Sequence, residues 1–228
     1  MSNFQAVIFD LDGTLINSVP DIANACNAAL SARNHPLHNY EEYKQLIGKG
    51  LRNLCERALP INMQNEEEIE VCHEILMNYY LEHPCDETEV YEGIPQVLEK
   101  LHAAGLKLAV LSNKADVLTA LIIEKLGLSK YFTIVSGLRK EFPRKPDPTS
   151  ALWILSELSQ AAGQEIAPEK VLYIGDSGVD MQTANNSGFY ALGVTWGFRS
   201  EEEIRENGAK SIIHERSEIV KIALGQVS

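Results

Sequence analysis

The chain has 228 residues, of which 45% are hydrophobic and 23% charged, values typical of a globular protein with its own apolar core. Its 32 acidic and 20 basic side chains give a formal net charge of -12. A surface of this sign repels nucleic acid and anionic lipid, so the composition argues against both as partners. It also repels an anionic substrate, so any phosphate site must supply its own positive charge.

Nothing in the sequence suggests a membrane or a secretory route. No apolar stretch approaches the roughly 20 residues of a membrane span, and the N-terminus lacks a signal-peptide pattern. The four cysteines are widely spaced, without a C-x-x-C pair, and are expected to be thiols in a reducing compartment. We therefore expect a cytoplasmic protein, either a monomer or a homodimer.

Short apolar runs alternate with amphipathic stretches along most of the chain, which predicts a parallel sheet covered by helices on both faces. The predicted strands, in chain order, are Ala6 to Phe9, Leu106 to Leu111, Phe132 to Val135, Val171 to Ile174, Tyr190 to Val194, and a short edge strand at Ile212 and Ile213. The fold class is therefore α/β, with a Rossmann-like core.

One interval breaks this alternation. Nearly a hundred residues separate the first two strands, far more than a βα connection needs. Apolar residues at helical spacing fill the stretch from about Pro20 to Leu81, which predicts a helical bundle inserted after the first strand. We divide the chain into a core domain of residues 1–16 and 86–228 and a cap domain of residues 17–85.

The first strand ends in Asp10-Leu11-Asp12-Gly13-Thr14. Gly13 permits a sharp turn that can bring Asp10 and Asp12 toward one pocket at the carboxyl edge of the sheet. Two close carboxylates repel each other, so a cation or a shared proton must offset them. The alternative is a turn in which both aspartates are simply solvated.

Two later segments add groups that suit a phosphate oxygen. The second strand leads into Ser112-Asn113-Lys114, which is followed by an expected helix. The hydroxyl of Ser112 and the amide of Asn113 suit this role, although such residues also cap ordinary helices. Lys145 stands before the Pro146-Asp147-Pro148 helix start. Taken alone, each of these signals is weak, because surface lysines and helix caps are common.

The fourth strand ends in Gly175-Asp176-Ser177-Gly178-Val179-Asp180. Two acids at spacing four, delivered by a buried strand, supply hard oxygen ligands. Such ligands suit Mg²⁺, which usually takes one or two carboxylates together with water and substrate phosphate.

The order of these acids, the serine and the lysine resembles the haloacid dehalogenase superfamily of phosphotransferases across the whole chain. Within that superfamily, the helical insertion, the Gly48-Lys49-Gly50 segment and the Thr195-Trp196-Gly197-Phe198 stretch resemble phosphoglycolate phosphatases. Asn17 departs from the pattern, since relatives commonly carry an aspartate there.

The resemblance implies a mechanism. Asp10 would be the nucleophile and Asp12 the acid and base of a magnesium-dependent phosphatase that acts through an aspartyl-phosphate. Mg²⁺ would be held by Asp10, the backbone carbonyl of Asp12 and Asp176, with Asp180 near the metal. The phosphoryl oxygens would be held by Thr14, Ser112, Asn113 and Lys145.

The inserted helices would then cover the site and contact the organic part of a small phosphorylated metabolite. Gly48, Lys49, Gly50 and Arg52 could face the pocket, since backbone N–H groups and cations suit a substrate carboxylate. The alternative is an ordinary turn between two helices with solvated charges.

Two other functions remain open. A phosphomutase related to β-phosphoglucomutase would share every core motif and differ only in passing the phosphoryl group to sugar instead of water. A non-enzymatic phospho-acceptor module of the receiver type also gathers aspartates and a lysine at strand ends. Receivers, however, are about half as long and carry the acceptor on a middle strand.

Overall fold

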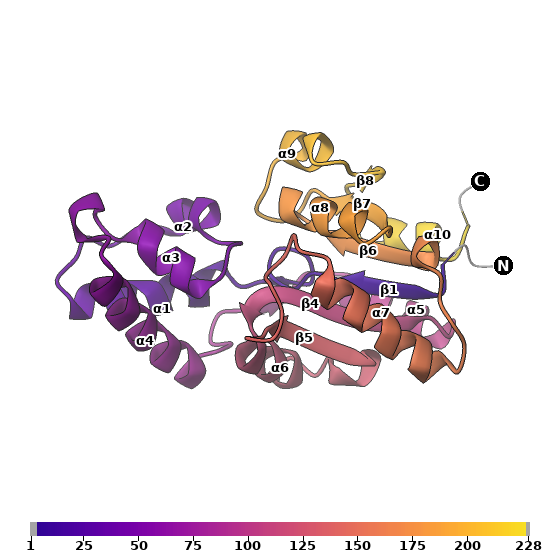
Figure 1. Ribbon diagram of the computed structural model, residues 1–228, viewed down its shortest axis with the longest axis horizontal. Helices are drawn as coiled ribbons and strands as arrows, with labels where there is room; N and C mark the ends of the chain where they lie inside the picture. The colour runs from indigo at the N-terminus through magenta and orange to yellow at the C-terminus, as the bar shows by residue number, and fades with distance from the viewer. Residues whose placement is uncertain (1–3, 227–228) are drawn as a thin grey trace.

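The computed structural model describes residues 4–226 (Figure 1). Its main sheet consists of β1 (Ala6–Phe9), β4 (Lys107–Ala115), β5 (Ile134–Leu138), β6 (Val171–Gly175), β7 (Tyr190–Val194) and β8 (Ser211–Ile213). The spatial order is β5-β4-β1-β6-β7-β8, and every neighbouring pair is parallel. The predicted α/β sheet is confirmed, and β8 is the edge strand expected at Ile212 and Ile213.

The predicted strand boundaries are wrong at two places. β4 does not end at Leu111 but runs through Ser112-Asn113-Lys114 to Ala115, with a register shift against β5 between Leu111 and Ala115. β5 begins at Ile134 and ends at Leu138. The polar end of β4 can stay extended because Asn113 bonds the backbone of Lys145 and Lys114 pairs with Asp12, partners that the local sequence does not reveal.

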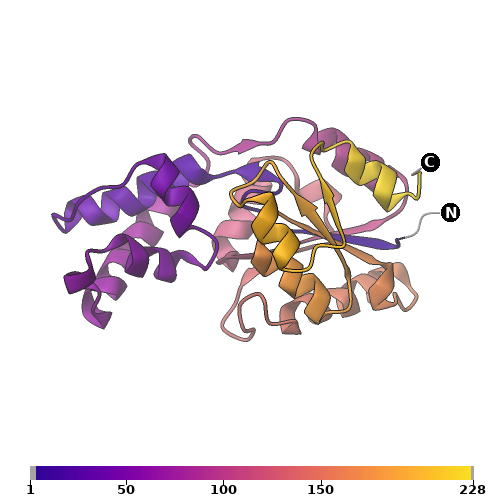
Figure 2. The ribbon, with the colours of Figure 1, turned by 90° about the horizontal axis from the view of Figure 1, so that it is seen from above.

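Helices cover both faces of the sheet (Figure 2). The side chains of β1 alternate, because Val7 and Phe9 point into one apolar cluster and Ala6 and Ile8 into the other. The first cluster includes residues of α5 (Ile94–Ala103), α6 (Asp116–Lys125) and α10 (Glu218–Ala223). The second includes residues of α7 (Thr149–Ala162), α8 (Gly178–Asn186) and α9 (Glu201–Glu206).

Of the five α-helices between β1 and β4, α5 packs on the sheet, and the other four form an insertion that lies beyond one end of the sheet (Figure 1). They are α1 (Val19–Ala32), α2 (Tyr40–Leu46), α3 (Leu51–Ala58) and α4 (Glu66–Glu82). The chain passes out and back along two short antiparallel strands, β2 (Ile16–Asn17) and β3 (Glu89–Val90). The helical insertion is as predicted; the domain boundaries at residues 17–85 stay a prediction. We call these four helices the cap.

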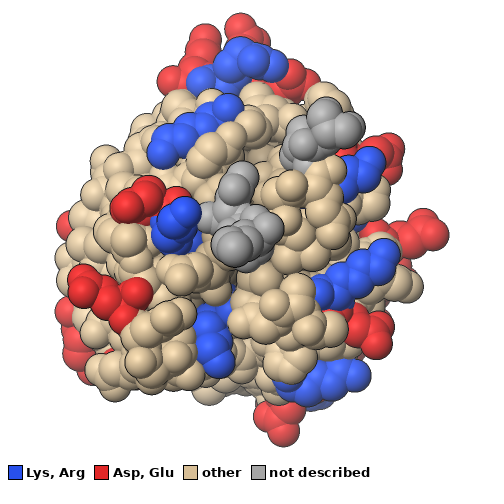
Figure 3. Space-filling model, turned by 90° about the vertical axis from the view of Figure 1, so that its right-hand side faces the viewer, with Lys and Arg blue, Asp and Glu red and all other residues tan. Residues whose placement is uncertain are grey.

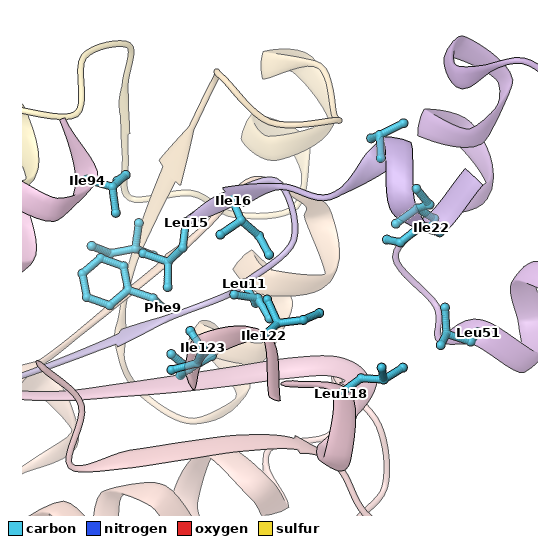
Figure 4. Close-up of a cluster of buried hydrophobic side chains, with 14 of the residues drawn as sticks. Phe9, Leu11, Leu15, Ile16, Ile22, Leu51, Ile94, Leu118, Ile122 and Ile123 are labelled. Carbon is cyan, nitrogen blue, oxygen red and sulfur yellow. The ribbon is translucent and has the colours of Figure 1, made fainter. Parts of the chain in front are cut away.

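Apolar contacts run without a break from the sheet into the cap. Figure 4 shows Phe9 and Leu11 near the sheet, Ile16 on the connection, and Ile22 and Leu51 on the cap helices. All five side chains are buried. This continuity positions the cap over the carboxyl ends of the strands.

The opposite end of the molecule, where the two termini lie, carries basic and acidic side chains side by side (Figure 3). The net negative charge therefore does not form one continuous acidic patch on that face. Within residues 4–226, no helix combines the length and the apolarity that crossing a bilayer would require.

Candidate active site

Three aspartates meet at the carboxyl edge of the sheet. Asp10 follows β1, Asp176 follows β6, and Asp180 lies in the first turn of α8. One carboxylate oxygen from each lies within 4.8 Å of the others, and all three residues are buried. The structure therefore brings together acids that are up to 170 positions apart, between Asp10 and Asp180.

Lys145 joins two of these acids. Its Nζ donates to Asp10 Oδ1 at 2.8 Å, to Asp180 Oδ1 at 2.7 Å and to the carbonyl of Leu111 at 3.1 Å. The lysine side chain is only 3% exposed. A loop lysine, weak as a sequence signal, is thus the one ammonium that pairs with this aspartate cluster among the residues that the structure describes.

Asp176 is fixed by close packing as well as by hydrogen bonds. Its Oδ2 accepts from the backbone N–H of Phe198 at 2.7 Å, and its Oδ1 accepts weakly from Thr14 Oγ1 at 3.4 Å. A Cβ atom at Gly13 or at Gly197 would collide with this carboxyl group. The two glycines let two loops close around Asp176, and Gly13 also adopts φ of 86°, which few other residues tolerate.

Asp180 is held by the helix that carries it. Ser177 and Asp180 form a capping box at the start of α8, in which Asp180 Oδ2 accepts from the Ser177 backbone N–H at 3.2 Å. The other oxygen of Asp180 faces Lys145. The G-D-S-x-x-D pattern therefore determines where α8 begins and orients the carboxylate of Asp180 toward Lys145.

The cluster has too little positive charge for its acids. Burial, followed by the repulsion of Asp180, raises the pKa of Asp10 well above its usual range, against the opposing effect of Lys145. Burial and Asp180 also raise the pKa of Asp176 to about 7. Three carboxylates face one ammonium, so two negative charges would be uncompensated if all were ionised.

Asp12 lies beside this cluster but has different partners. Its Oδ1 accepts from Ser18 Oγ at 2.5 Å and from Lys114 Nζ at 2.9 Å. The sequence did not identify Lys114 as a site residue, because at the end of the second strand it carried no signal that would tell it from an ordinary lysine. The unexpected extension of β4 is what brings it to the site.

Ser112 is buried and lines the cavity with Asp10 and Asp12. Asn113 has a structural position as well. Its Nδ2 donates to the Gly48 and Lys145 carbonyls at 3.3 Å each, and its Oδ1 accepts from the Lys145 N–H at 2.9 Å. Asn113 therefore ties the loop of Lys145 to the cap.

A cavity of about 50 Å³ lies between these polar groups and the cap. On the side of the cap, the cavity is lined by the apolar side chains of Ile22, Ile47, Leu51 and Leu54, and by Gly48 and Gly50 of the loop between α2 and α3. Gly48 and Gly50 therefore reach the cavity as expected.

The structure does not bring Lys49 and Arg52 to this cavity. Arg52 instead donates to Glu70 Oε1 at 2.5 Å and to Glu66 Oε1 at 2.6 Å on α4, and its side chain is 41% exposed. Lys49 is exposed. The expectation that Arg52 faces the pocket is corrected here, because the nearby acids of the cap draw its guanidinium outward.

A second cation missed by the sequence reasoning joins the cap to the core. Arg199, which lines the cavity, donates from Nη1 to the Lys44 carbonyl at 2.8 Å and from Nη2 to the Ile47 carbonyl at 2.5 Å. Both carbonyls belong to the C-terminal end of α2. Arg199 thereby satisfies orphan carbonyls at a helix end, where positive charge is favourable.

The acid cluster fits a divalent metal ion. Its donors are all oxygens, as Mg²⁺ prefers. They are buried, close enough to share one ion, and short of positive charge, as the raised pKa values of Asp10 and Asp176 indicate. A divalent cation would supply the two missing positive charges.

The comparison with known proteins agrees with this geometry. The family described as haloacid dehalogenase-like hydrolase matches residues 7–194, and the chain belongs to that family. A phosphoglycolate phosphatase of Aquifex aeolicus is 37% identical over 194 residues, covering 85% of this chain and 86% of its own. One from Vibrio parahaemolyticus is 29% identical over 226 residues, covering 96% of both chains.

Solved structures give the same result. The crystal structure of a predicted phosphoglycolate phosphatase from Haemophilus somnus superimposes with a TM-score of 0.86 at 28% identity, covering 97% of this chain and 99% of that one. The chain is a phosphatase of the haloacid dehalogenase family, similar to phosphoglycolate phosphatases. An enzyme of this class acts on a small phosphorylated substrate.

Proposed function

We propose that the protein is a magnesium-dependent phosphatase that hydrolyses a small organic phosphate monoester through an aspartyl-phosphate on Asp10. The observation that carries the proposal is the convergence of Asp10, Asp176 and Asp180 around Lys145, next to Asp12 and Ser112 on one cavity. The names of the relatives make 2-phosphoglycolate the first substrate to test.

In the first step, a carboxylate oxygen of Asp10 attacks phosphorus, and the bond from phosphorus to the leaving oxygen breaks. Asp12, which lines the same cavity, gives its proton to that oxygen as the alcohol departs. Lys145 and Ser112 stabilise the charge that spreads over the phosphoryl oxygens.

In the second step, water attacks the phosphorus of the aspartyl-phosphate while Asp12 takes a proton from that water. The bond between phosphorus and Asp10 breaks, inorganic phosphate leaves, and Asp10 is again a free carboxylate. The one acid therefore serves both half-reactions, as donor first and acceptor second.

Asp10, Asp176 and the backbone carbonyl of Asp12 would hold Mg²⁺, with Asp180 beside it, and the ion would neutralise negative charge on the transferring phosphoryl group. Thr14 and Asn113 would act mainly by fixing Asp176 and Lys145, the groups that they contact. Residues 17–85 would move as one cap that excludes water from the reaction.

The central test replaces Asp10 by asparagine. An amide cannot act as this nucleophile, so Asp10→Asn should lower turnover by about 10⁴-fold or more with every substrate. The matched control is Asp147→Asn, because Asp147 lies close in sequence to Lys145 but accepts from the Thr149 N–H at the start of α7. Near-normal turnover in Asp10→Asn would contradict the proposal.

The substrate class is tested with a panel of phosphorylated metabolites that includes 2-phosphoglycolate, assayed with and without Mg²⁺. Released inorganic phosphate supports the phosphatase. An isomerised sugar phosphate without net phosphate release would favour the mutase, and stoichiometric phosphorylation without turnover would favour a phospho-acceptor module.

A further inference from the structure

Lys114 is a buried cation to which the proposed mechanism gives no role. Its side chain is 1% exposed, and its Nζ contacts two groups from different parts of the molecule. It donates to Asp12 Oδ1 at 2.9 Å and to the hydroxyl of Tyr80 at 2.8 Å. Burying an ammonium costs free energy unless it is paired, so these two contacts hold Lys114 and its partners in fixed positions.

The contacts on Asp12 are one-sided. Lys114 and Ser18 both donate to Oδ1, at 2.9 Å and 2.5 Å. Among the described residues, no hydrogen-bond donor reaches Oδ2. Two donors on one oxygen fix the plane of the carboxyl group and leave the other oxygen free for a reacting group in the cavity.

The same contacts connect Asp12 to both ends of the cap. Ser18 directly precedes α1, where the chain enters the cap, and Tyr80 lies near the end of α4, where the chain leaves it. Tyr80 is fully buried, and burial raises the pKa of its hydroxyl well above the ordinary value of 10.0, so the group stays neutral and accepts from the ammonium. The position of the cap thus determines whether Lys114 keeps its second partner.

We propose that Lys114, supported by Tyr80, is a positioning residue that aims the free oxygen of Asp12 at the leaving group when the cap is seated. This inference rests on the proposed function, because it takes Asp12 as the proton donor. It adds a residue from β4 and one from α4 to the residues that control the reaction.

The test compares two substrates with the same ring and different leaving groups. Phenyl phosphate releases a basic phenolate that benefits from a proton, whereas p-nitrophenyl phosphate releases a much weaker base that departs without one. The ratio kcat/KM reports the steps through departure of the leaving group, not the later hydrolysis of the aspartyl-phosphate. A misaimed Asp12 should therefore lower kcat/KM selectively for phenyl phosphate.

Lys114→Met removes the ammonium but keeps an unbranched apolar side chain. It should lower kcat/KM for phenyl phosphate about 10–100-fold and for p-nitrophenyl phosphate less than about threefold. Tyr80→Phe removes only the hydroxyl and should lower kcat/KM for phenyl phosphate about threefold to tenfold. Tyr79→Phe, the neighbouring cap tyrosine that stacks on His83, is the matched control and should change neither value.

A double variant separates positioning from general damage. With Asp12→Asn already present, Lys114→Met should cause no further loss on phenyl phosphate, because the group that it aims is gone. Equal losses on both substrates, additive losses in the double variant, or no loss in Lys114→Met would each overturn the inference. If thermal unfolding shows that Lys114→Met does not fold, Tyr80→Phe is compared with Tyr79→Phe instead. A loss of kcat/KM on phenyl phosphate in Tyr80→Phe alone supports the inference, and equal values in the two variants overturn it.

The outcome also distinguishes this inference from the proposed function. If Asp10→Asn is inactive and Asp12→Asn is selective for phenyl phosphate while Lys114→Met is not, the phosphatase mechanism stands and only the role of Lys114 fails. If Asp10→Asn turns over both substrates normally, the mechanism itself fails.

Discussion

The cap side and the core each contain a cluster of side chains that could hold a metal ion, fully buried in the core and partly buried in the cap. In the cap, His35, Glu68 and Cys72 bring one ligand atom each within 4.8 Å of the others. In the core, Asp10, Asp176 and Asp180 do the same. The distances between ligand atoms do not distinguish the two clusters, although we propose a metal only for the cluster in the core.

The two clusters differ in whether neighbouring cations compensate the charge of their acids. Both oxygens of Glu68 accept from the guanidinium of Arg33, at 2.9 Å and 2.8 Å, and one also contacts His35. Arg33, followed by His35, lowers the pKa of Glu68 to about 2.

The core acids behave in the opposite way, because burial raises the pKa of Asp176 to about 7. A cluster whose negative charge is already compensated by neighbouring cations stabilises the fold. A cluster with excess negative charge can bind a cation from solution.

The largest expected effect comes from changing the uncompensated cluster. Asp176→Asn keeps the shape that fits between Gly13 and Gly197, and an amide oxygen can still accept from Phe198. It should lower kcat at least about 10²–10³-fold, the usual cost of losing a charge that stabilises the transition state. In metal-free protein it should raise the Tm, because one of three mutually repelling acids has become neutral. A lower Tm without metal would contradict the charge argument.

The next largest effect is the stabilisation of the wild-type protein by magnesium. At a concentration of about 100 Kd, an ion that binds only the folded chain raises the Tm of a protein of this size by about 5–10 °C. Scanning calorimetry with and without Mg²⁺ measures the shift. Asp176→Asn should lose most of it, and Glu68→Gln should keep it in full. Loss of the shift in Glu68→Gln would place the ion in the cap instead.

A smaller effect is expected when the compensated cluster is broken. Glu68→Gln should lower the Tm by about 2–4 °C at neutral pH, since Arg33 is half-exposed and the pair is partly screened by water. Turnover should stay within about threefold, because none of the three residues of this cluster lines the cavity. Glu74→Gln, which removes the same charge from an exposed position of α4, controls for a general effect of charge.

The pH dependence of this pair follows from the sign of its pKa shift. The folded-state pKa of Glu68 lies below the ordinary value of 4.5, so its contribution to stability is full above about 4.5 and is lost as the pH falls toward 2. The Tm difference between wild type and Glu68→Gln should therefore shrink over that interval. A difference that stays constant down to pH 2 would mean that Glu68 does not act through its charge.

The same comparison explains what could be predicted from the sequence. Asp10 and Asp176 directly follow buried apolar runs, and the carboxyl ends of parallel strands meet at one edge, so their convergence follows from strand order. Lys114 could not be recognised in this way, because its role depends on β4 continuing past Leu111 through a register shift. That extension is stabilised by Asp12 and Tyr80, which are distant in the sequence.

In the cap, periodicity predicts that helices exist but not which way each one faces. Leu51 and Leu54 of α3 do line the cavity, and Arg52 on the same helix points outward. The rotation of α3 is set by its packing on α4, including the acids Glu66 and Glu70, and no local pattern encodes that contact. Arg199 was missed for the same reason, since its partners are carbonyls of α2.

The smallest effect is expected for Arg52→Ala. Its partners Glu66 and Glu70 are 80% and 53% exposed at the side chain, so these pairs are surface ion pairs that contribute little. We expect a Tm change below about 2 °C and a KM that changes less than about twofold, both for 2-phosphoglycolate and for p-nitrophenyl phosphate. A KM that rises only for the carboxylate-bearing substrate would mean that Arg52 leaves its acids and turns into the cavity when substrate binds. The cap would then supply a substrate-recognising cation, and its role would no longer be limited to packing over the core.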